Sequence, residues 1–430
     1  MLDIQFIRDH AEQLQQVADQ KGIAVSIAAV LEADARRLDL LQQVEALRRA
    51  RNMLAQQGAS VDRASSEAMR LQAEARQQGA VLKALERELR DAFEAWHELM
   101  LLVPNLASPA TPVGVSDADN VEVKRVGEAP RFDFEARDHV ALGEACDLFD
   151  LARGVKVAGT RQYFLRGVGL SLHRAVQQLA LDLLMDRGFT AMDVPLLARE
   201  DAMRNTGFFP GGRDQTYAVP EDNAWLVGTG EVPLVSYYSN EIVDVDAPIR
   251  LAAVSNCFRR EAGSAGRDVR GLYRVHQFAK VEQVVICKND LQLAESILHD
   301  MIHNSEELLQ RLELPYRIVA VCTGDMGQKN YQQYDIETWM PSRHAYGETH
   351  SASSLLDFQA RRSRIRFMDE HGKPQFCYTL NNTMVATPRI LIPLLENHQR
   401  EDGSIRIPAA LQPYMRGMTE IRPHVTNTDL

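Results

Sequence analysis

The chain has 430 residues, of which 45% are hydrophobic and 25% charged, a composition typical of a globular protein of two or three domains with a large core. Its 48 basic and 59 acidic residues give a net charge of −11, which excludes a generally basic surface for nucleic acid and leaves only a local patch for a polyanion. The five cysteines are widely spaced, which argues against a disulfide framework or a zinc knuckle. The N-terminus has no apolar signal segment, and no apolar run reaches the roughly 18 residues of a membrane span. We therefore expect a soluble cytoplasmic protein.

Heptad spacing of apolar residues marks the first hundred residues. Small and apolar residues recur at alternating intervals of four and three from Ala64 to Leu99. Upstream, Leu40, Val44 and Leu47 keep the same rhythm, which then places Arg51 in the seam. The polar stretch at 56–65 contains Gly58 and separates the two runs. We therefore predict two long helices that fold back on each other as an antiparallel coiled-coil hairpin.

The tip of this hairpin is locally basic. From residue 46 to residue 76 there are six basic residues and three acidic ones, on a chain that is acidic overall. A basic end favours contact with the phosphates of a polyanion. A coiled coil that serves only for dimerisation is the alternative, and the periodicity alone does not distinguish the two. The candidate phosphate contacts are Arg48, Arg49, Arg63, Arg70 and Arg76.

A change in composition follows Leu102. The next segment holds Pro104, Pro109 and Pro112 among small polar residues, a pattern typical of a linker. We therefore predict a helical domain at residues 1–105, a linker at 106–120 and a second domain at 121–430.

The second domain shows mixed helical and strand patterns. Residues 170–189 read as an amphipathic helix closed by Gly188, and residues 190–197 as a strand broken at Pro195. The β-branched runs at 279–287 and 317–324 are typical of buried strands. Because few stretches show a regular alternation of strands and helices, we predict an α+β fold on an antiparallel sheet.

The usual glycine-rich phosphate cradles are missing, since the sequence has neither G-x-G-x-x-G after a strand nor G-x-x-x-x-G-K-[ST]. Bound phosphates would therefore be held by arginines, which can grip two oxygens in a bidentate fork. Residues 256–287 begin and end like strands, and the Gly-rich loop between them carries Arg267, Arg270 and Arg274. Loop arginines that are merely solvated are the alternative interpretation.

The string FRREAGSAGRDVRGLYRVHQFAKVE at 258–282 resembles motif 2 of the class II aminoacyl-tRNA synthetases, and in detail the seryl-tRNA synthetase family. GFTAMDVPLL at 188–197 is similar to motif 1, and TLNNTMVATPRILIPLLE at 379–396 to motif 3. The resemblance implies a class II catalytic domain and a tRNA-binding coiled-coil arm. It further implies ATP-dependent activation of L-serine to seryl-adenylate and transfer to tRNA(Ser), and to tRNA(Sec) where present, with ATP and Mg²⁺ as cofactors and no zinc.

The resemblance also assigns roles to single residues. Activation is attack of the serine carboxylate on the α-phosphate of ATP, so the catalytic groups, Arg259 and Arg389, would neutralise charge there. Glu261 would read the adenine amino group and Phe278 would stack on the ring. Arg389 would cover the other face of the adenine or reach the γ-phosphate. The implied ATP contacts are Arg259, Glu261, Arg274, Phe278, Glu348, Ser351 and Arg389, with Mg²⁺ on Glu348 and Ser351. The implied serine contacts are Thr229, Glu231, Arg259, Glu282 and Thr383.

Two departures from the family pattern leave alternatives open. Motif 3 reads NNTMVATPR at 381–389, where bacterial members commonly have N-G-S-G-L-A-x-G-R, and Gly347 replaces the arginine before Glu348. Losing the glycines reduces close approach of the backbone. An inhibitor-tolerant second copy and a non-charging RNA-binding or regulatory relative are the alternatives. His276 and His350 are not assigned to a metal, because no second ligand lies at metal spacing.

A homodimer is also expected. Residues 170–197 hold more apolar surface than one exposed face of a single chain accommodates.

Overall fold

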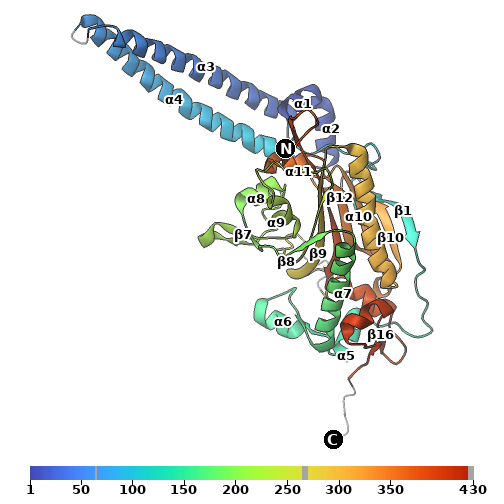
Figure 1. Ribbon diagram of the computed structural model, residues 1–430. Coiled ribbons are helices and arrows are strands. Elements are labelled where there is room, and N and C mark those ends of the chain that lie inside the picture. Colours follow the sequence, from blue (N-terminus) through green and yellow to red (C-terminus); the bar gives the residue numbers. More distant parts are fainter. Residues whose placement is uncertain (63–64, 264–269, 425–430) are drawn as a thin grey trace. The chain divides into compact units, whose positions relative to one another are not determined.

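The computed structural model describes residues 1–62, 65–263 and 270–424. The chain divides into two compact units, Leu2–Pro104 and Met1 with Asn105–Leu430 (Figure 1). Arg63 and Arg267, two of the arginines singled out in the sequence, lie outside the described residues.

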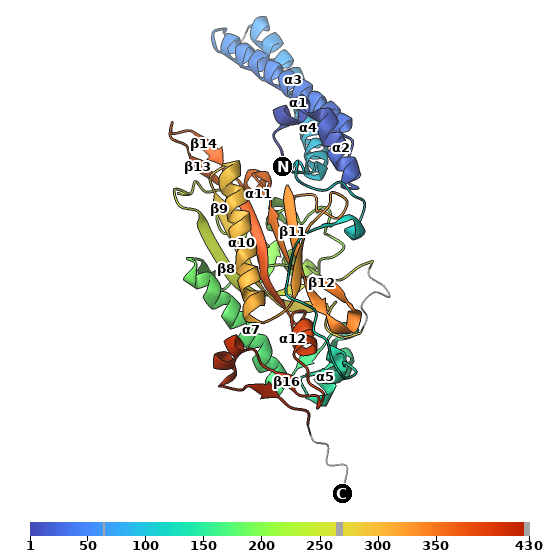
Figure 2. The same cartoon turned by 90° about the vertical axis from the view of Figure 1, so that its right-hand side faces the viewer.

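Four helices build the first unit: α1 (Ile4–Asp9), α2 (Ala11–Gln20), α3 (Ile27–Ala59) and α4 (Ser66–Leu102). Ser26 and Ser65 cap the two long helices, because each hydroxyl accepts a backbone N–H in the first turn. The long helices lie side by side in both views (Figures 1 and 2). Leu40, Val44 and other heptad residues are buried between them, so the predicted antiparallel hairpin is confirmed.

Two residues of the hairpin differ from what a uniform seam would suggest. Arg51, which the heptad rhythm places in the seam, is exposed, so that part of the prediction is wrong. Its neighbour Ala50 is half-buried instead. Towards the base of the hairpin, Asp34 is fully buried and pairs with Arg8 and with Arg37, whose Nη2 lies 2.6 Å from Asp34 Oδ1. The pair with Arg8 fastens the short helix α1 to α3, and the pair with Arg37 lies within α3.

The predicted linker is held on the second unit. The Asn105 amide donates to the carbonyl of Leu355 at 2.8 Å. The backbone N–H of Ser108 donates to Tyr331 O at 2.8 Å, and Thr323 N–H donates to Pro112 O at 2.9 Å. We call residues 105–115 the strap. Because its backbone groups are paired in this way, the strap is part of the folded body.

An eight-stranded sheet forms the centre of the second unit, in the order β1-β10-β11-β12-β15-β9-β8-β4. Every neighbouring pair is antiparallel except β4 and β8, which run parallel. The predicted α+β fold on an antiparallel sheet is thus confirmed, with one parallel edge strand. The strands are β1 (Val121–Val126), β4 (Thr190–Met192), β8 (Ile249–Phe258), β9 (Gln277–Cys287), β10 (Tyr316–Ala320), β11 (Gln332–Met340), β12 (Ala345–Ser354) and β15 (Tyr378–Thr387).

Small elements surround this sheet. The helices are α5 (His139–Ala145), α6 (Leu151–Ala158), α8 (Glu200–Asn205), α9 (Glu231–Ser236), α11 (Phe358–Ser363) and α12 (Leu391–Asn397), with 3₁₀ turns η1 (Asp117–Asp119), η2 (Pro220–Asp222), η3 (Pro341–Arg343) and η4 (Ala409–Met415). The short strands are β2 (Phe149–Asp150), β3 (Phe164–Leu165), β5 (Leu197–Arg199), β6 (Ala218–Val219), β7 (Ala224–Leu226), β13 (Arg366–Met368), β14 (Pro374–Phe376), β16 (Ile405–Arg406) and β17 (Glu420–Ile421).

The two faces of the sheet carry different helices. On one face lie α7 (Gly167–Asp186) and α10 (Leu291–Arg311), which pack against the central strands (Figure 2). Odd-numbered residues of β9, such as Val281 and Val285, join this core, whereas Val284 and Ile286 join a second core with α9 and α11. Because side chains alternate along a strand, Phe278, Lys280 and Glu282 belong to the second face. That face carries the candidate site.

The apolar run of α7 is covered within the chain itself. Ten of its residues are buried, and it packs on η4, β15 and α10. The argument from uncovered apolar surface is therefore wrong for most of α7, and the predicted homodimer has to rest on other side chains.

Among the described residues, no helix combines the length and apolarity that a bilayer crossing requires. All five cysteines are buried free thiols.

Candidate active site

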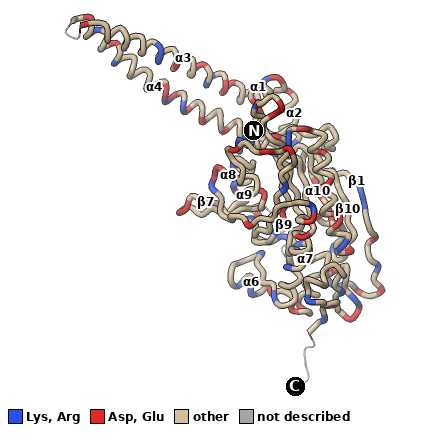
Figure 3. Tube along the Cα trace, in the orientation of Figure 1, with Lys and Arg blue, Asp and Glu red and all other residues tan. Residues whose placement is uncertain are grey.

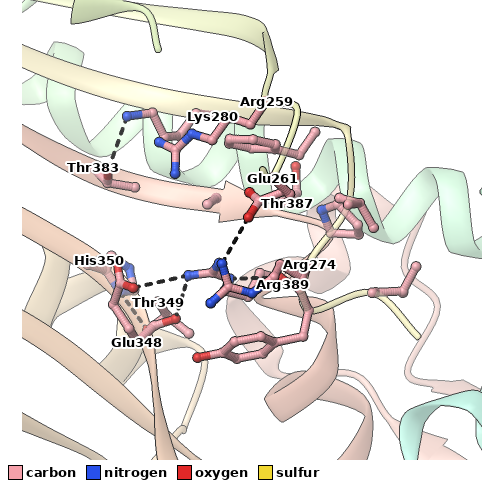
Figure 4. A pocket seen from close by; sticks show the side chains of 16 residues that line it. Arg259, Glu261, Arg274, Lys280, Glu348, Thr349, His350, Thr383, Thr387 and Arg389 are labelled. Carbon is pink, nitrogen blue, oxygen red and sulfur yellow. Dashed lines mark hydrogen bonds and ion pairs between the residues drawn. The ribbon is translucent and has the colours of Figure 1, made fainter. Parts of the chain in front are cut away.

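A cavity of about 510 Å³ opens beside β9, β12 and β15 (Figure 4). A second hollow of about 1230 Å³ adjoins it and extends over Gln215, Gly228 and Ala262. Five of the predicted residues line both of them: Arg259, Glu261, Arg274, Glu348 and Arg389. Phe278 and Thr383 line the smaller one. Six of the seven residues assigned to ATP therefore line one cavity, although they span 130 positions of the chain from Arg259 to Arg389. The seventh, Ser351, lines neither hollow.

Arg259 and Arg389 are held in place by a few bonds each. Arg259 Nε donates to the carbonyl of Gly228 at 3.3 Å, and its guanidinium lies 5.1 Å from the centre of the Phe278 ring. Arg389 Nε donates to Tyr273 O at 3.1 Å, and its Nη1 donates to Glu348 O at 3.0 Å. A guanidinium has five N–H donors, so both arginines retain donors for an anion.

Arg274 faces a carboxylate across the cavity. Its Nη1 donates to Glu261 Oε2 at 2.8 Å, as Figure 4 shows. The Arg389 guanidinium stacks 4.5 Å from the centre of the ring of Tyr273, the residue directly before Arg274. Positive and negative groups therefore alternate around the opening, an arrangement that suits a ligand with several phosphates and a polar base.

A buried polar cluster lies deeper, next to Thr383. Glu282 is fully buried and pairs with Lys280, two residues earlier on the same face of β9. Thr229 Oγ1 donates to Glu282 Oε2 at 3.3 Å, and Lys280 Nζ donates to Thr383 Oγ1 at 3.3 Å. Asn381 Nδ2 approaches the other oxygen, Glu282 Oε1, at 3.4 Å. Buried charges need such partners, because their desolvation is costly.

Glu231 has a different setting from the one that the sequence suggested. It is buried, and its Oε1 accepts from Lys329 Nζ at 2.5 Å and from Gln359 Nε2 at 2.6 Å. Like Thr229 and Glu282, it lines neither hollow. Its backbone N–H donates to Thr229 Oγ1 at 3.3 Å. This backbone group, and not the Glu231 carboxylate, helps to orient Thr229, which in turn bonds to Glu282.

The two residues that the sequence assigned to Mg²⁺, Glu348 and Ser351, both lie on β12, which pairs with β11. Glu348 has 48% of its side chain exposed, and Ser351 Oγ accepts from Gln333 Nε2 at 3.1 Å. The strand register shifts between Ile336 and Glu337 of β11, which forms a bulge in β12 between Glu348 and Ser351. Asp335 pairs with Ser351 across the strands, and burial together with the nearby Glu348 carboxylate raises the pKa of Asp335 to about 8. The described residues contain no group of three His, Cys, Asp or Glu side chains that could hold a metal ion.

The two histidines left unassigned have structural roles. His350 is buried, its Nδ1 lies 2.8 Å from Thr349 Oγ1, and burial lowers its pKa to about 3. His276 Nδ1 lies 2.9 Å from the carbonyl of Arg259.

Sequence reasoning missed Lys280, Lys329, Asn381 and Asp335. Lys280 could have been found, because residues two apart in a strand share a face. Lys329 and Asp335 carry no local signal, since Lys329 lies 98 residues from its partner Glu231.

The candidate tRNA contacts on the hairpin are all surface arginines where the structure describes them. Figure 3 shows basic and acidic residues interspersed along both helices. Arg48 pairs with Glu86 at 2.6 Å across the hairpin, and Arg49 lies 3.4 Å from Glu45. Arg70 and Arg76 are exposed and form no ion pair with any other described residue. Of the four described candidates, they are the two whose charge is not paired with a described carboxylate.

Comparisons with known proteins agree on one family. Residues 1–107 match the family model "Seryl-tRNA synthetase N-terminal domain", and residues 217–398 match "tRNA synthetase class II core domain (G, H, P, S and T)". A serine--tRNA ligase of Deinococcus radiodurans is 46% identical over 97% of this chain and 98% of its own length. One from Rubrobacter xylanophilus is 43% identical over 96% of this chain and 98% of its own.

Solved structures give the same result. Seryl-tRNA synthetase from Pyrococcus horikoshii, complexed with ATP, superposes with a TM-score of 0.89 and 35% identity, covering 99% of this chain and all of that one. The cytoplasmic serine-tRNA ligase of Naegleria fowleri, in complex with AMP, gives a TM-score of 0.84 at 25% identity, over 98% of this chain and 99% of its own.

Proposed function

Because this chain belongs to the seryl-tRNA synthetases, we propose that the cavity beside β9, β12 and β15 is where it joins ATP to serine. The chain is an ATP-dependent serine–tRNA ligase, which activates L-serine and transfers it to tRNA(Ser). The observation that carries the placement is the convergence of Arg259, Arg274 and Arg389 on one opening. No covalent nucleophile is required, since the serine carboxylate itself attacks the α-phosphate.

ATP would lie along the arginine-lined wall. Arg259 would bind the α-phosphate and the serine carboxylate, where two anions approach each other and charge builds up. Phe278, stacked beneath Arg259, would support the adenine, and Glu261 would accept from its amino group. Arg274 would exchange part of its bond with Glu261 for the outer phosphates. Arg389, which Tyr273 and Glu348 hold in place, would contact the nucleotide from the opposite side, at the adenine or at the γ-phosphate.

Mg²⁺ would be held at Glu348 and Ser351. Their oxygens suit a hard cation that takes few protein ligands and completes its shell with phosphate oxygens and water. The ion would neutralise charge on the phosphates. Glu348 would supply a carboxylate and Ser351 a hydroxyl, so most of the remaining ligands would come from the phosphates of the nucleotide and from water.

Serine would be read by the buried cluster. The Glu282 carboxylate would bind the ammonium group and accept from the serine hydroxyl, with Thr229 and Thr383 as further partners. Lys280, which pairs with Glu282, would hold that carboxylate in place before serine enters. The backbone N–H of Glu231 would help to orient Thr229, and the Glu231 carboxylate would anchor this segment on Lys329 and Gln359.

Serine, rather than alanine, threonine or cysteine, is expected to support pyrophosphate exchange. An analogue without the hydroxyl leaves buried acceptors unpaired, at a cost of about 1–3 kcal/mol. Thr383→Val, which removes one hydroxyl and keeps the shape, should lower the preference for serine over alanine by about tenfold. Exchange rates with each amino acid, measured for both proteins, test this. Equal rates with serine and alanine in the unmodified protein would contradict the assignment of the pocket.

The hairpin would bind tRNA(Ser), and tRNA(Sec) where the cell has one. A coiled coil cannot read bases in the deep major groove of A-form RNA, so it would follow the backbone and the overall form. Arg70 and Arg76 are available for phosphates, whereas Arg48 is engaged by Glu86. The reduced, buried thiols fit a cytoplasmic location.

A homodimer is expected on the basis of exposed apolar side chains around α7. Leu170 and Met185 on α7, with Phe164 before it and Leu197 after it, are each between 45% and 51% exposed, and a partner subunit would cover large apolar side chains of this kind. Sedimentation velocity should show a dimer at micromolar concentration. Leu170→Glu, at the start of α7, should shift it toward the monomer, and an unmodified protein that is active as a monomer at nanomolar concentration would refute the proposal.

A further inference from the structure

A buried histidine far from the sequence motifs touches the wall of the ATP cavity. His139 lies in the first turn of α5 and is 9% exposed. Its Nε2 accepts a hydrogen bond from the backbone N–H of Leu272 at 3.2 Å. Leu272, Tyr273 and Arg274 form one continuous part of that wall. His139 therefore holds the backbone next to the residues proposed to bind ATP.

The other ring nitrogen of His139 is fixed by motif 3. Nδ1 lies 2.9 Å from Glu396 Oε1, and the same oxygen accepts the His139 backbone N–H at 2.9 Å. Glu396 lies in α12, directly after the motif 3 strand, and is fully buried. Because Nε2 accepts from Leu272, the ring proton resides on Nδ1 and is donated to Glu396. The ring thus has a defined tautomer and a defined orientation.

Glu396 also receives two bonds from Ser342, one from its N–H at 2.9 Å and one from its hydroxyl at 2.8 Å. The next residue, Arg343, stacks its guanidinium 4.3 Å from the centre of the Tyr273 ring. The carboxylate therefore joins three segments, α5, α12 and η3, and two of them reach the 272–274 wall. Both oxygens of the Glu396 carboxylate accept hydrogen bonds, as a buried carboxylate requires.

Gly271 shows how closely the wall is fitted to the histidine. Its φ is +87°, and a Cβ added there would lie 2.2 Å from His139 Nε2. Only glycine combines that backbone conformation with this approach. Before it, Arg270 Nη1 lies 3.1 Å from Asp138 Oδ2, the residue that precedes His139. The end of the motif 2 loop is thus seated on the beginning of α5.

We propose that His139 is a positioning residue for ATP, which acts through Leu272 to hold Tyr273 and Arg274 in the cavity wall, with Glu396 fixing its tautomer. This rests on the proposed function, in which Arg274 binds the outer phosphates. It adds to that function a residue of α5 that contacts neither substrate. The consequence is a selective effect on ATP, since the serine cluster around Glu282 has no contact with this anchor among the described residues.

Two matched substitutions separate positioning from bulk stability. His139→Asn keeps a donor for Glu396 at the place of Nδ1 but has no acceptor for Leu272. His139→Gln can place its amide oxygen near the position of Nε2 and keep that acceptor. In pyrophosphate exchange, His139→Asn should raise the KM for ATP about tenfold with the KM for serine within about twofold. His139→Gln should recover most of the loss.

Hydrogen exchange of the full-length protein supplies a readout that is independent of activity. The amides of residues 272–274 should exchange at least about tenfold faster in His139→Asn than in His139→Gln. Unchanged exchange in that segment, an unchanged KM for ATP, or equal losses by both variants in step with a lowered Tm would overturn the proposal. If His139→Asn does not fold, Ser342→Ala is used, and a KM for ATP within error of the unmodified protein then overturns it.

Arg274→Ala distinguishes a failure of this anchor from a failure of the proposed site. If Arg274→Ala leaves the KM for ATP unchanged, the assignment of Arg274 is wrong, whatever the hydrogen exchange shows. If it raises that KM while His139→Asn does not, the site stands and the anchor is wrong.

Discussion

Deleting residues 36–90 is expected to abolish charging of tRNA(Ser) while serine-dependent pyrophosphate exchange stays within about twofold of normal. The reason is that every residue proposed to touch ATP or serine belongs to the unit formed by Asn105–Leu430. Arg36, the first deleted residue, and Asp91, the first residue after the deletion, line one groove of the hairpin. A short glycine linker can therefore join the two shortened helices. Charging should fall by more than about 100-fold, since loss of several phosphate contacts removes most of the affinity for the tRNA.

Point variants sharpen this test. Arg70→Gln with Arg76→Gln should weaken tRNA binding and reduce the log–log salt slope by about two, one per lost phosphate contact. Arg48→Gln is the matched control with a smaller effect, because Glu86 already engages that side chain. Filter binding at several salt concentrations measures the slopes.

Normal charging by the variant that lacks residues 36–90 would show that the hairpin serves dimerisation rather than tRNA binding. Loss of pyrophosphate exchange in that variant would show that the catalytic body needs the hairpin in order to fold.

Arg259→Lys is expected to lower serine activation by about 10³-fold, the second large effect. Its guanidinium is oriented by Gly228 O and by the Phe278 ring. Lysine keeps the charge but loses the planar fork that can hold a phosphate and a carboxylate together. An effect of about 10³ is what removal of one preorganised donor costs when charge develops in the transition state. Single-turnover formation of seryl-adenylate measures the chemical step directly.

The neighbouring Arg260 provides the control. It is exposed, and its backbone N–H donates to Gln215 O at 2.9 Å. Arg260→Lys should leave adenylate formation within about twofold, because Arg260, unlike Arg259, lines neither hollow of the site. Similar losses in both variants would show that the loop needs arginine for its own structure, and the role assigned to Arg259 would be wrong.

The hairpin and the sheet could be predicted because their signals are periodic. The heptads of α3 and α4 repeat often enough to fix both helices, whereas Arg51 fell outside the seam, since an α-helix does not repeat in whole heptads and the seam drifts. The parallel pairing of β4 with β8 could not be read from three residues of strand. Strand patterns give burial and length, but not the direction of the neighbour.

The site could be predicted only as far as its residues lie within the sequence motifs. Arg259, Glu261 and Arg389 are named by their motifs and meet as expected. The partners that set their chemistry are distant in sequence: Lys329 reaches Glu231, and His139 reaches Leu272. The burial of Glu231 under Lys329 and Gln359 removes it from the cavity. Nothing within a few residues of Glu231 indicates this, because tertiary packing brings those partners together.

The strap determines where related enzymes can be recombined. Its hydrogen bonds to residues 323–331 and to Leu355 form a single interface within the catalytic body. A chimaera that takes its hairpin from one relative and its body from another would split this interface if the crossover were placed at residue 120, where the proline-rich composition ends. A crossover between Pro104 and Asn105 keeps the interface within one parent. The portable module that could carry one tRNA preference to another body therefore ends at Pro104.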